Sequence, residues 1–142
     1  MKKIFSILFI SLFIFSCGDN LVEEVKERYD DGKFKVVEYY KKVGDNQELV
    51  KVSHYYKNGQ IRQESNYKDG KYDGEQIWYH DNGQIKREGN YKDGKKEGKL
   101  TYYKTDGSLF CEGIYENGKK LNGSFLTYYS DDTINKEENY KE

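Results

Sequence analysis

The segment Tyr79-His80-Asp81-Asn82-Gly83-Gln84-Ile85 decides the fold, because copies of it recur at a fixed distance along the chain. An earlier copy begins at Tyr55 and a later one at Tyr103, so the period is about 24 residues. A fourth copy begins one residue late, at Tyr128. Self-similarity at a fixed period is typical of repeat proteins, in which each unit is stabilised by stacking on its neighbours. We therefore expect an elongated protein of stacked units.

Each unit contains two short glycine-containing turns, and proline is absent from the whole chain. The first turn carries Asn-Gly or Asp-Gly, the dipeptides typical of a two-residue type I′ hairpin turn, because both central residues of that turn need positive φ. The second turn also carries Asp-Gly or Asn-Gly, followed by lysine. The glycines expected in the first turn are Gly59, Gly83 and Gly107, and those expected in the second are Gly70, Gly94 and Gly118.

The residues between the turns have the alternation of a β-strand. In residues 84–91, the pattern places Ile85 and Tyr91 on one face and Glu88 on the other. Strands joined only by tight turns pair with their sequence neighbours and leave no room for a crossover helix. The fold class expected is all-β, an elongated antiparallel meander of repeated β-hairpins.

This pattern resembles the MORN repeat, in the variant form found in bacterial exported proteins. The resemblance covers residues 53–142 and implies the same meander of hairpins. Residues 29–52 hold a weaker copy around Asp31-Gly32-Lys33, which we expect to be a degenerate first repeat or cap, since terminal repeats are often atypical.

The N-terminus has a different composition. In residues 1–16, Lys2 and Lys3 precede an apolar stretch, as in a signal peptide, so we expect a signal helix that is removed from the mature protein. The following Cys17 completes a segment that resembles the lipobox of bacterial lipoproteins, which implies lipid modification at Cys17 and an anchor in the bacterial cell envelope, inner or outer membrane, facing away from the cytoplasm. An ordinary cleaved signal with an incidental cysteine is the alternative. Residues 17–28 are expected to form a linker.

Charge and motifs argue against several function classes. Without Lys2 and Lys3 the chain keeps 22 Lys and Arg against 25 Asp and Glu, so nucleic acid is an unlikely partner. A glutamate recurs in every unit, whereas an active site needs one special constellation, so we expect a structural role for this glutamate and no enzyme. The two histidines, His54 and His80, lack the spacing of metal ligands, and we expect no metal and no cofactor.

Binding is the remaining class of function. Tyr and Trp contribute much of the energy of protein interfaces, and a repeated row of them can dock an extended peptide or glycan. The candidate binding residues are Trp78, Tyr79, Tyr55, Tyr103 and Tyr128. The sequence favours a binding or scaffold module for a protein or glycan partner, although each ring could also simply cover the sheet. An antitoxin or immunity protein, as some proteins with this repeat variant are labelled, is the alternative.

The lipobox-like segment generates the first prediction. The mature protein should begin at a lipid-modified Cys17 and fractionate with membranes, because two or more acyl chains give lasting attachment. Cys17→Ala should accumulate as an uncleaved or mislocalised product on immunoblots of membrane and soluble fractions. Mass spectrometry that finds an unmodified Cys17 on a soluble secreted chain would contradict this prediction.

Overall fold

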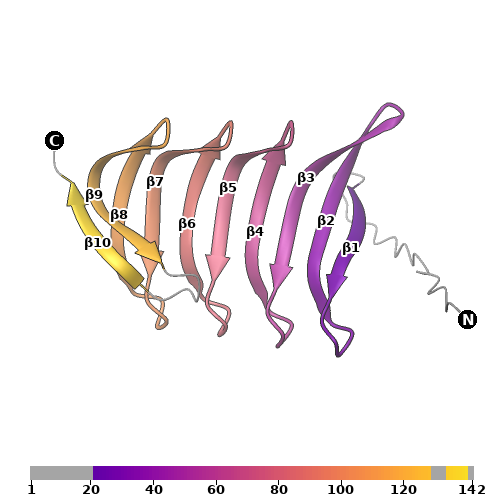
Figure 1. The fold of residues 1–142 in the computed structure, drawn as a ribbon, viewed down its shortest axis with the longest axis horizontal. Helices are drawn as coiled ribbons and strands as arrows, with labels where there is room; N and C mark the ends of the chain where they lie inside the picture. Colours follow the sequence, from indigo (N-terminus) through magenta and orange to yellow (C-terminus); the bar gives the residue numbers. More distant parts are fainter. Residues whose placement is uncertain (1–20, 129–133, 141–142) are drawn as a thin grey trace, which may run out of the picture.

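The computed structural model describes residues 21–128 and 134–140 of the chain. They form one open sheet of ten antiparallel strands, in which spatial order follows sequence order (Figure 1). The strands are β1 (Leu21–Arg28), β2 (Phe34–Val43), β3 (Asn46–Tyr55), β4 (Ile61–Lys68), β5 (Lys71–Tyr79), β6 (Ile85–Lys92), β7 (Lys95–Tyr103), β8 (Leu109–Glu116), β9 (Lys119–Tyr128) and β10 (Ile134–Tyr140). The predicted all-β antiparallel meander is confirmed, while the expected signal helix lies outside the described residues.

The N-terminal boundary differs from the sequence-based expectation. Residues 21–28, expected to be part of a linker, form β1 and pair with β2 from Leu21↔Lys41 to Arg28↔Phe34. The physical reason is that a hairpin turn requires a strand on each side, and the turn at Asp31-Gly32 therefore implies a strand before it as well as after it. The boundary expected between residues 52 and 53 falls inside β3, where Val52 and Ser53 are each paired with both β2 and β4.

The first turns at Gly59, Gly83 and Gly107 are not the type I′ turns expected from the sequence. Asn82 has negative φ, and only Gly83, at 87°, has positive φ. The Gly83 N–H donates to the His80 carbonyl (3.0 Å), and the His80 N–H donates to the Gln84 carbonyl (2.8 Å), which defines a three-residue loop with a glycine bulge. The Asn82 Oδ1 accepts from the Gln84 N–H (3.0 Å), and this Asx turn holds Asn82 outside the left-handed region.

True type I′ turns occur in the second turns, at the opposite ends of the strands. There Asp69, Asp93 and Asn117 each have φ of 49°, and the glycine after each also has positive φ. These turns hydrogen-bond sideways to the preceding unit: the Gly94 N–H donates to the Tyr72 carbonyl (2.8 Å) and the Gly118 N–H to the Lys96 carbonyl (2.9 Å).

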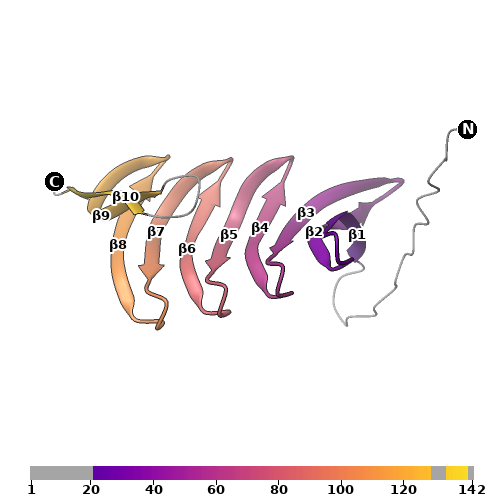
Figure 2. The same ribbon diagram turned by 60° about the horizontal axis from the view of Figure 1, so that its bottom comes forward.

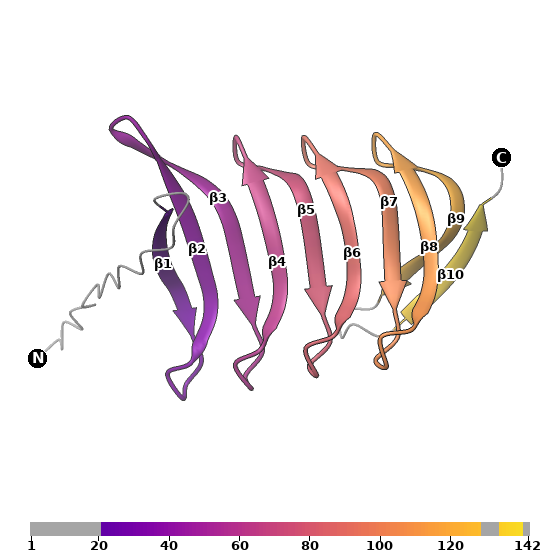
Figure 3. The ribbon, with the colours of Figure 1, turned by 180° about the vertical axis from the view of Figure 1, so that it is seen from behind.

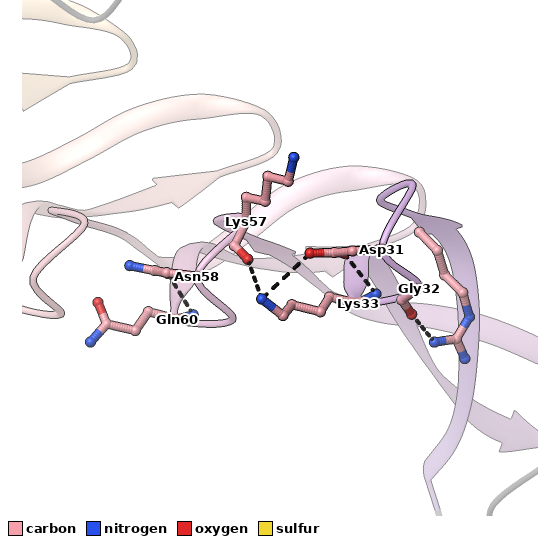
Figure 4. A network of polar contacts seen from close by, with 7 residues as sticks. Asp31, Gly32, Lys33, Lys57, Asn58 and Gln60 are labelled. Atoms are coloured by element: carbon pink, nitrogen blue, oxygen red, sulfur yellow. Dashed lines mark hydrogen bonds and ion pairs between the residues drawn. The ribbon is translucent and has the colours of Figure 1, made fainter.

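The first turns also stack on one another. Asn58 Nδ2 donates to the Asp81 carbonyl (2.9 Å), and Asn82 Nδ2 repeats this contact with the Thr105 carbonyl (2.8 Å). At the N-terminal end, Asp31 stands at the position of the asparagine, and Lys33 makes the contact between turns: its Nζ donates to the Lys57 carbonyl (3.0 Å) and pairs with Asp31 (3.4 Å), as Figure 4 shows. At both ends of the strands, the turns therefore join neighbouring units through contacts that are additional to the hydrogen bonds between strands.

A β-bulge follows each first turn. In β6 the pairing passes from Tyr79↔Ile85 to Trp78↔Arg87, so Lys86 is the additional residue that forms the bulge. Because paired residues share a face, Ile85 lies on the same face as Tyr79, and the bulge separates it from the face of Tyr91. The expectation that Ile85 and Tyr91 share a face was therefore wrong, because the residue inserted at the bulge shifts the alternation of the side chains between the two faces.

The sheet has two different faces. The core face carries large buried side chains on the odd-numbered strands opposite small residues on the even-numbered ones; the large residues are Val52, Gln76, Leu100 and Phe125, and the small ones are Ser65, Gly89 and Gly113. The glutamate face carries Glu64, Glu88 and Glu112. Without a second layer, the core face is covered by its own aromatic rings, including Tyr115 packed edge-on against Phe125 with centroids 4.9 Å apart.

The strands bend because of glycines near the second turns. Gly74 has φ of 94° and Gly98 has φ of 73°, backbone angles that other residues rarely adopt. In Figure 1, β5 and β7 leave the upper turns almost horizontally and then bend downward, and the curvature of the strands is visible in Figures 2 and 3. A curved single layer lets neighbouring strands cover each other's side chains.

The packing of small against large residues generates a stability prediction. A Cβ added to Gly89 would lie 2.3 Å from Leu100 Cδ1. Gly89→Ala should therefore lower the free energy of unfolding by about 1–3 kcal/mol, the usual cost of overpacking. Urea denaturation measures this cost, and in a Leu100→Val background, which lacks Cδ1, the same substitution should cost less. An equal cost in both backgrounds would contradict the proposed clash.

Candidate functional site

A hollow of about 160 Å³ lies beside Trp78 on the core face, near the strand ends that the first turns connect. Trp78 on β5 is paired with Gln63 on β4 and with Arg87 on β6, so these three side chains share the core face. The Tyr56 hydroxyl donates to the Tyr79 carbonyl (2.7 Å) and joins two units there. The residues that line the hollow are Tyr56, Arg62, Gln63, Trp78, Tyr79, Lys86 and Arg87.

The centre of this hollow is a cation–π pair. The Arg87 guanidinium carbon lies 3.6 Å from the centroid of the Trp78 ring system. At this distance the planar guanidinium covers the indole and is held in one orientation. The pair gives the hollow a rigid aromatic wall with a positive charge on it.

Two further cations come from the β-bulges. Arg62 is the additional residue of the β4 bulge and Lys86 that of the β6 bulge. A bulge turns side chains away from strict alternation, and Lys86 and Arg87, which are consecutive, both line the hollow. Among the residues that the structure describes, no carboxylate belongs to the lining. The described lining thus contains three cationic side chains beside the indole.

The hollow breaks the symmetry of the repeats. One unit later, Tyr102 takes the place of Trp78 and is 1% exposed, and the bulge pair that follows it is Phe110-Cys111, without charge. One unit earlier the corresponding residue is His54. His54 is also a half-buried ring between two charged bulge residues, Lys35 on β2 and Arg62 on β4, so the Trp78 unit differs from the other described units in its indole with an arginine stacked on it.

The tyrosines of the glutamate face form a second feature. The Tyr79 hydroxyl donates to Glu64 Oε2 (3.2 Å), and the Tyr103 hydroxyl donates to Glu88 Oε1 (2.6 Å). Partial burial and the negative charge of Glu64 raise the pKa of Tyr79 to about 12. The hydrogen bond to Glu88 raises the pKa of Tyr103.

Ion pairs complete this face. Glu64 pairs with Lys51 on β3, and Glu112 pairs with Lys99 on β7 (2.5 Å). Glu64, Glu88 and Glu112 thus each contact a lysine or a tyrosine of a neighbouring strand. These contacts support a structural role for the recurring glutamate.

The structure separates the residues singled out from the sequence. Trp78 lies on the core face, whereas Tyr79 and Tyr103 hydrogen-bond to carboxylates on the glutamate face. Tyr55 is on the glutamate face too, with its hydroxyl 3.5 Å from that of Tyr39. Tyr128 ends β9, and its side chain is outside the described ones. The aromatic residues that the sequence suggested as one row are thus divided between the two faces of the sheet. Trp78 lies on the core face, which contains the hollow.

The turn glycines have backbone angles that suit their expected positions. All six have positive φ: Gly59 at 91°, Gly70 at 72°, Gly83 at 87°, and Gly94, Gly107 and Gly118 at 82°. The cationic residues of the hollow were not identified from the sequence, because their position depends on where the bulges fall. The only sequence signal for them is that Arg62 and Lys86 stand 24 residues apart, one full period.

Among the described residues, no group of three or more His, Cys, Asp or Glu side chains is placed to bind a metal ion. Nor does the described part of the chain contain a helix long and apolar enough to cross a membrane.

Comparison with known families identifies the repeat. The family model described as MORN repeat variant matches residues 50–69, 72–93 and 121–142. The stretch between the last two matches contains β7 and β8 with the same turns and bulge. MORN repeats are generally protein- or membrane-binding modules. No curated protein and no solved structure matches the chain significantly.

The raised pKa of Tyr79 generates a prediction on alkaline stability. A phenol that ionises near pH 10.0 when unfolded and near 12 when folded stabilises the fold below pH 10, and this contribution is lost as the pH rises through 12. The free energy of unfolding in urea should therefore fall between pH 10 and 12, and it should fall less in Tyr79→Phe. Identical pH dependences of the two proteins would contradict the assignment.

Proposed function

Since the chain is built from MORN-variant repeats, we propose that it is a lipid-anchored, exported, non-enzymatic module that binds a protein or glycan partner at the hollow beside Trp78. The observation that carries this proposal is the break in repeat symmetry at the hollow. A residue that serves the fold can recur in every unit, as the glutamate and the turn glycines do. The pair of Trp78 and the arginine stacked on it, Arg87, occurs in one of the described units, as a binding site would require.

The character of the hollow favours binding. Trp and Arg are the side chains enriched at the energetic centres of protein interfaces, and here they are stacked at 3.6 Å. Chemistry on a substrate would need an acid, a base or a nucleophile beside a reacting atom. The lining offers cations, an amide and phenols, and the recurring carboxylates lie on the opposite face. Binding is the function that this set of groups serves best.

The proposed anchor has a geometric consequence. Only residues 18–20 separate Cys17 from β1, which begins at Leu21. Four residue steps span at most about 14 Å when fully extended. A lipid-modified Cys17 would therefore hold the β1 end of the sheet close to the membrane, while the rest of the sheet extends away from the tether.

A co-purification experiment tests the proposal. The full-length chain, tagged at its C-terminus and kept in a neutral detergent, is used to capture partners from cell-envelope and extracellular extracts. Trp78→Ala should lose the captured partner, because it removes the aromatic wall of the hollow, whereas Tyr103→Ala, on the glutamate face, should keep it. Circular dichroism establishes that both variants remain folded.

The outcomes separate the possible functions. Retention of the partner by a folded Trp78→Ala protein would overturn the assignment of the hollow as the binding site. Capture of one dedicated toxin, lost with Trp78→Ala, would identify the module as an immunity protein that uses the same hollow. Turnover of a substrate by the purified chain would overturn the non-enzymatic assignment.

A further inference from the structure

Four asparagines of the chain are followed directly by glycine, a pair of residues that is prone to lose the asparagine amide. They are Asn58, Asn82, Asn117 and Asn122. The backbone nitrogen of the glycine can attack the side-chain carbonyl carbon of the asparagine, because glycine has no Cβ to hinder the approach. The local sequence gives all four pairs the same chemistry, whereas the structure places them in three different surroundings.

The side-chain amides of Asn58 and Asn82 are fixed in the stacked first turns. Asn82 Oδ1 accepts from the Gln84 N–H (3.0 Å), and Asn82 Nδ2 donates to the Thr105 carbonyl (2.8 Å), so both ends of the amide are engaged. Asn58 makes the same pair of contacts. The attacking nitrogen is engaged as well, since the Gly83 N–H donates to a carbonyl of its own turn (3.0 Å). Loss of either amide would have to break contacts that join two units.

Asn122 lies inside a strand and is held by its backbone. β9 pairs Asn122 with Ile114 and Gly123 with Gly113 on β8. In a strand the side chain stands away from the sheet while the backbone N–H lies in its plane, so the Asn122 amide and the Gly123 nitrogen point in different directions. A Cβ added to Gly123 would lie 2.3 Å from the Glu112 carbonyl oxygen, so the backbone is closely packed there. The peptide after Asn122 is thus held in place.

Asn117 has a more open surrounding. It is the first central residue of a type I′ turn, with φ of 49°, and both Asn117 and Gly118 are exposed. The Asn117 main-chain N–H donates to Glu97 Oε2 (2.9 Å), but no hydrogen bond among the described residues holds its side-chain amide. A Cβ added to Gly118 would have the Lys95 Cβ, at 3.6 Å, as its nearest neighbour. The Asn117 amide has room to turn toward the Gly118 nitrogen.

The type of this turn also favours the reaction. Turns of types I′ and II′ share positive φ at the first central residue and differ in φ at the second. Rotation of the peptide between Asn117 and Gly118 therefore needs no change of φ at Asn117, and glycine tolerates the new φ at position 118. The contact that this rotation breaks runs from the Gly118 N–H to the Lys96 carbonyl (2.9 Å).

We infer that Asn117 is the Asn-Gly site at which the folded chain loses its side-chain amide spontaneously. The Gly118 nitrogen gives its proton to hydroxide and bonds to Asn117 Cγ, while the bond from Cγ to Nδ2 breaks and the nitrogen takes up a proton from water and leaves as ammonia. Water then opens the five-membered ring, without oxidation or reduction, to an aspartate or isoaspartate at position 117. Each event adds one negative charge. This modification site is separate from the hollow and does not depend on the proposed function.

The aspartate product suits the repeat. The two earlier second turns carry aspartate at this position, Asp69 and Asp93, with the same φ of 49°. The fold therefore already accommodates a carboxylate there. At Asn82, by contrast, a carboxylate would face the Thr105 carbonyl to which the amide now donates.

Peptide mapping of the full-length chain in neutral detergent tests this inference. Cleavage after lysine and arginine places the four asparagines in separate peptides, which are residues 58–62, 72–86, 105–119 and 121–136. The folded chain is incubated at mildly alkaline pH and digested at mildly acidic pH, and mass spectrometry with fragment spectra follows the loss of each amide. Asn117 should lose its amide about tenfold faster than the other three asparagines, since each further hydrogen bond to be broken slows a reaction about tenfold.

The unfolded chain is the matched control. In urea the four pairs lose their surroundings, so their rates should become similar, and Asn58 and Asn82 should accelerate more than Asn117. Equal rates at Asn82 and Asn117 in the folded chain would overturn the inference. A ranking that persists in urea would also overturn it, because the local sequence and not the fold would then set the rates.

Substitutions that imitate the product complete the test. Asn117→Asp should keep the urea midpoint of the parent, whereas Asn58→Asp and Asn82→Asp should lower it, since each removes a donor that joins two units. Isoelectric focusing should show an acidic form that accumulates as the folded parent ages and that does not accumulate in Asn117→Asp. An acidic form that accumulates in Asn117→Asp at the rate of the parent would place the reaction elsewhere, and a lowered midpoint of Asn117→Asp would contradict the fit of the product.

Discussion

Close contact between a small residue on one strand and a large one on the next is the constraint on which this sheet depends. The protein has a single layer, so its apolar side chains must be covered by their own neighbours. The space above Gly89 is filled by Leu100, and the space above Gly113 by Phe125, whose ring lies where a Cβ would be. Each unit thus supplies both a space and the side chain that fills its neighbour's space, which ties the stability of one repeat to the next.

The turns at both ends of the strands reinforce this coupling between units. The bulges beside the first turns provide side chains for the candidate binding site. Stacked turns hold the units at a constant spacing through contacts such as Asn58 Nδ2 to the Asp81 carbonyl. The bulge that each unit carries then moves an additional side chain out of the strand alternation. In β2 this side chain is Lys35, which pairs with Glu27 (2.7 Å), whereas Arg62 and Lys86 line the hollow beside Trp78. A feature of the repeat is in this way converted into a local site by the identity of three side chains.

The two faces consequently serve different purposes. On the glutamate face, carboxylates are engaged by Tyr79, Tyr103, Lys51 and Lys99, so charge there is compensated within the sheet. On the core face, Arg62, Lys86 and Arg87 line the hollow beside Trp78. Charge pairs between strands contribute to the fold, whereas an arginine stacked on a tryptophan is a combination typical of the centres of protein interfaces.

The amino-acid sequence by itself determined the period, the positions of the turns, the all-β class and the order of the strands, because these follow from local dipeptides and from turns too short for any crossover. It also pointed to Trp78. Only the tertiary structure decided the type of the first turn, the face on which Ile85 lies, the strand at residues 21–28 and the cationic hollow. The physical reason is that a bulge is a property of the register between two paired strands, and one inserted residue reverses the face of every side chain beyond it.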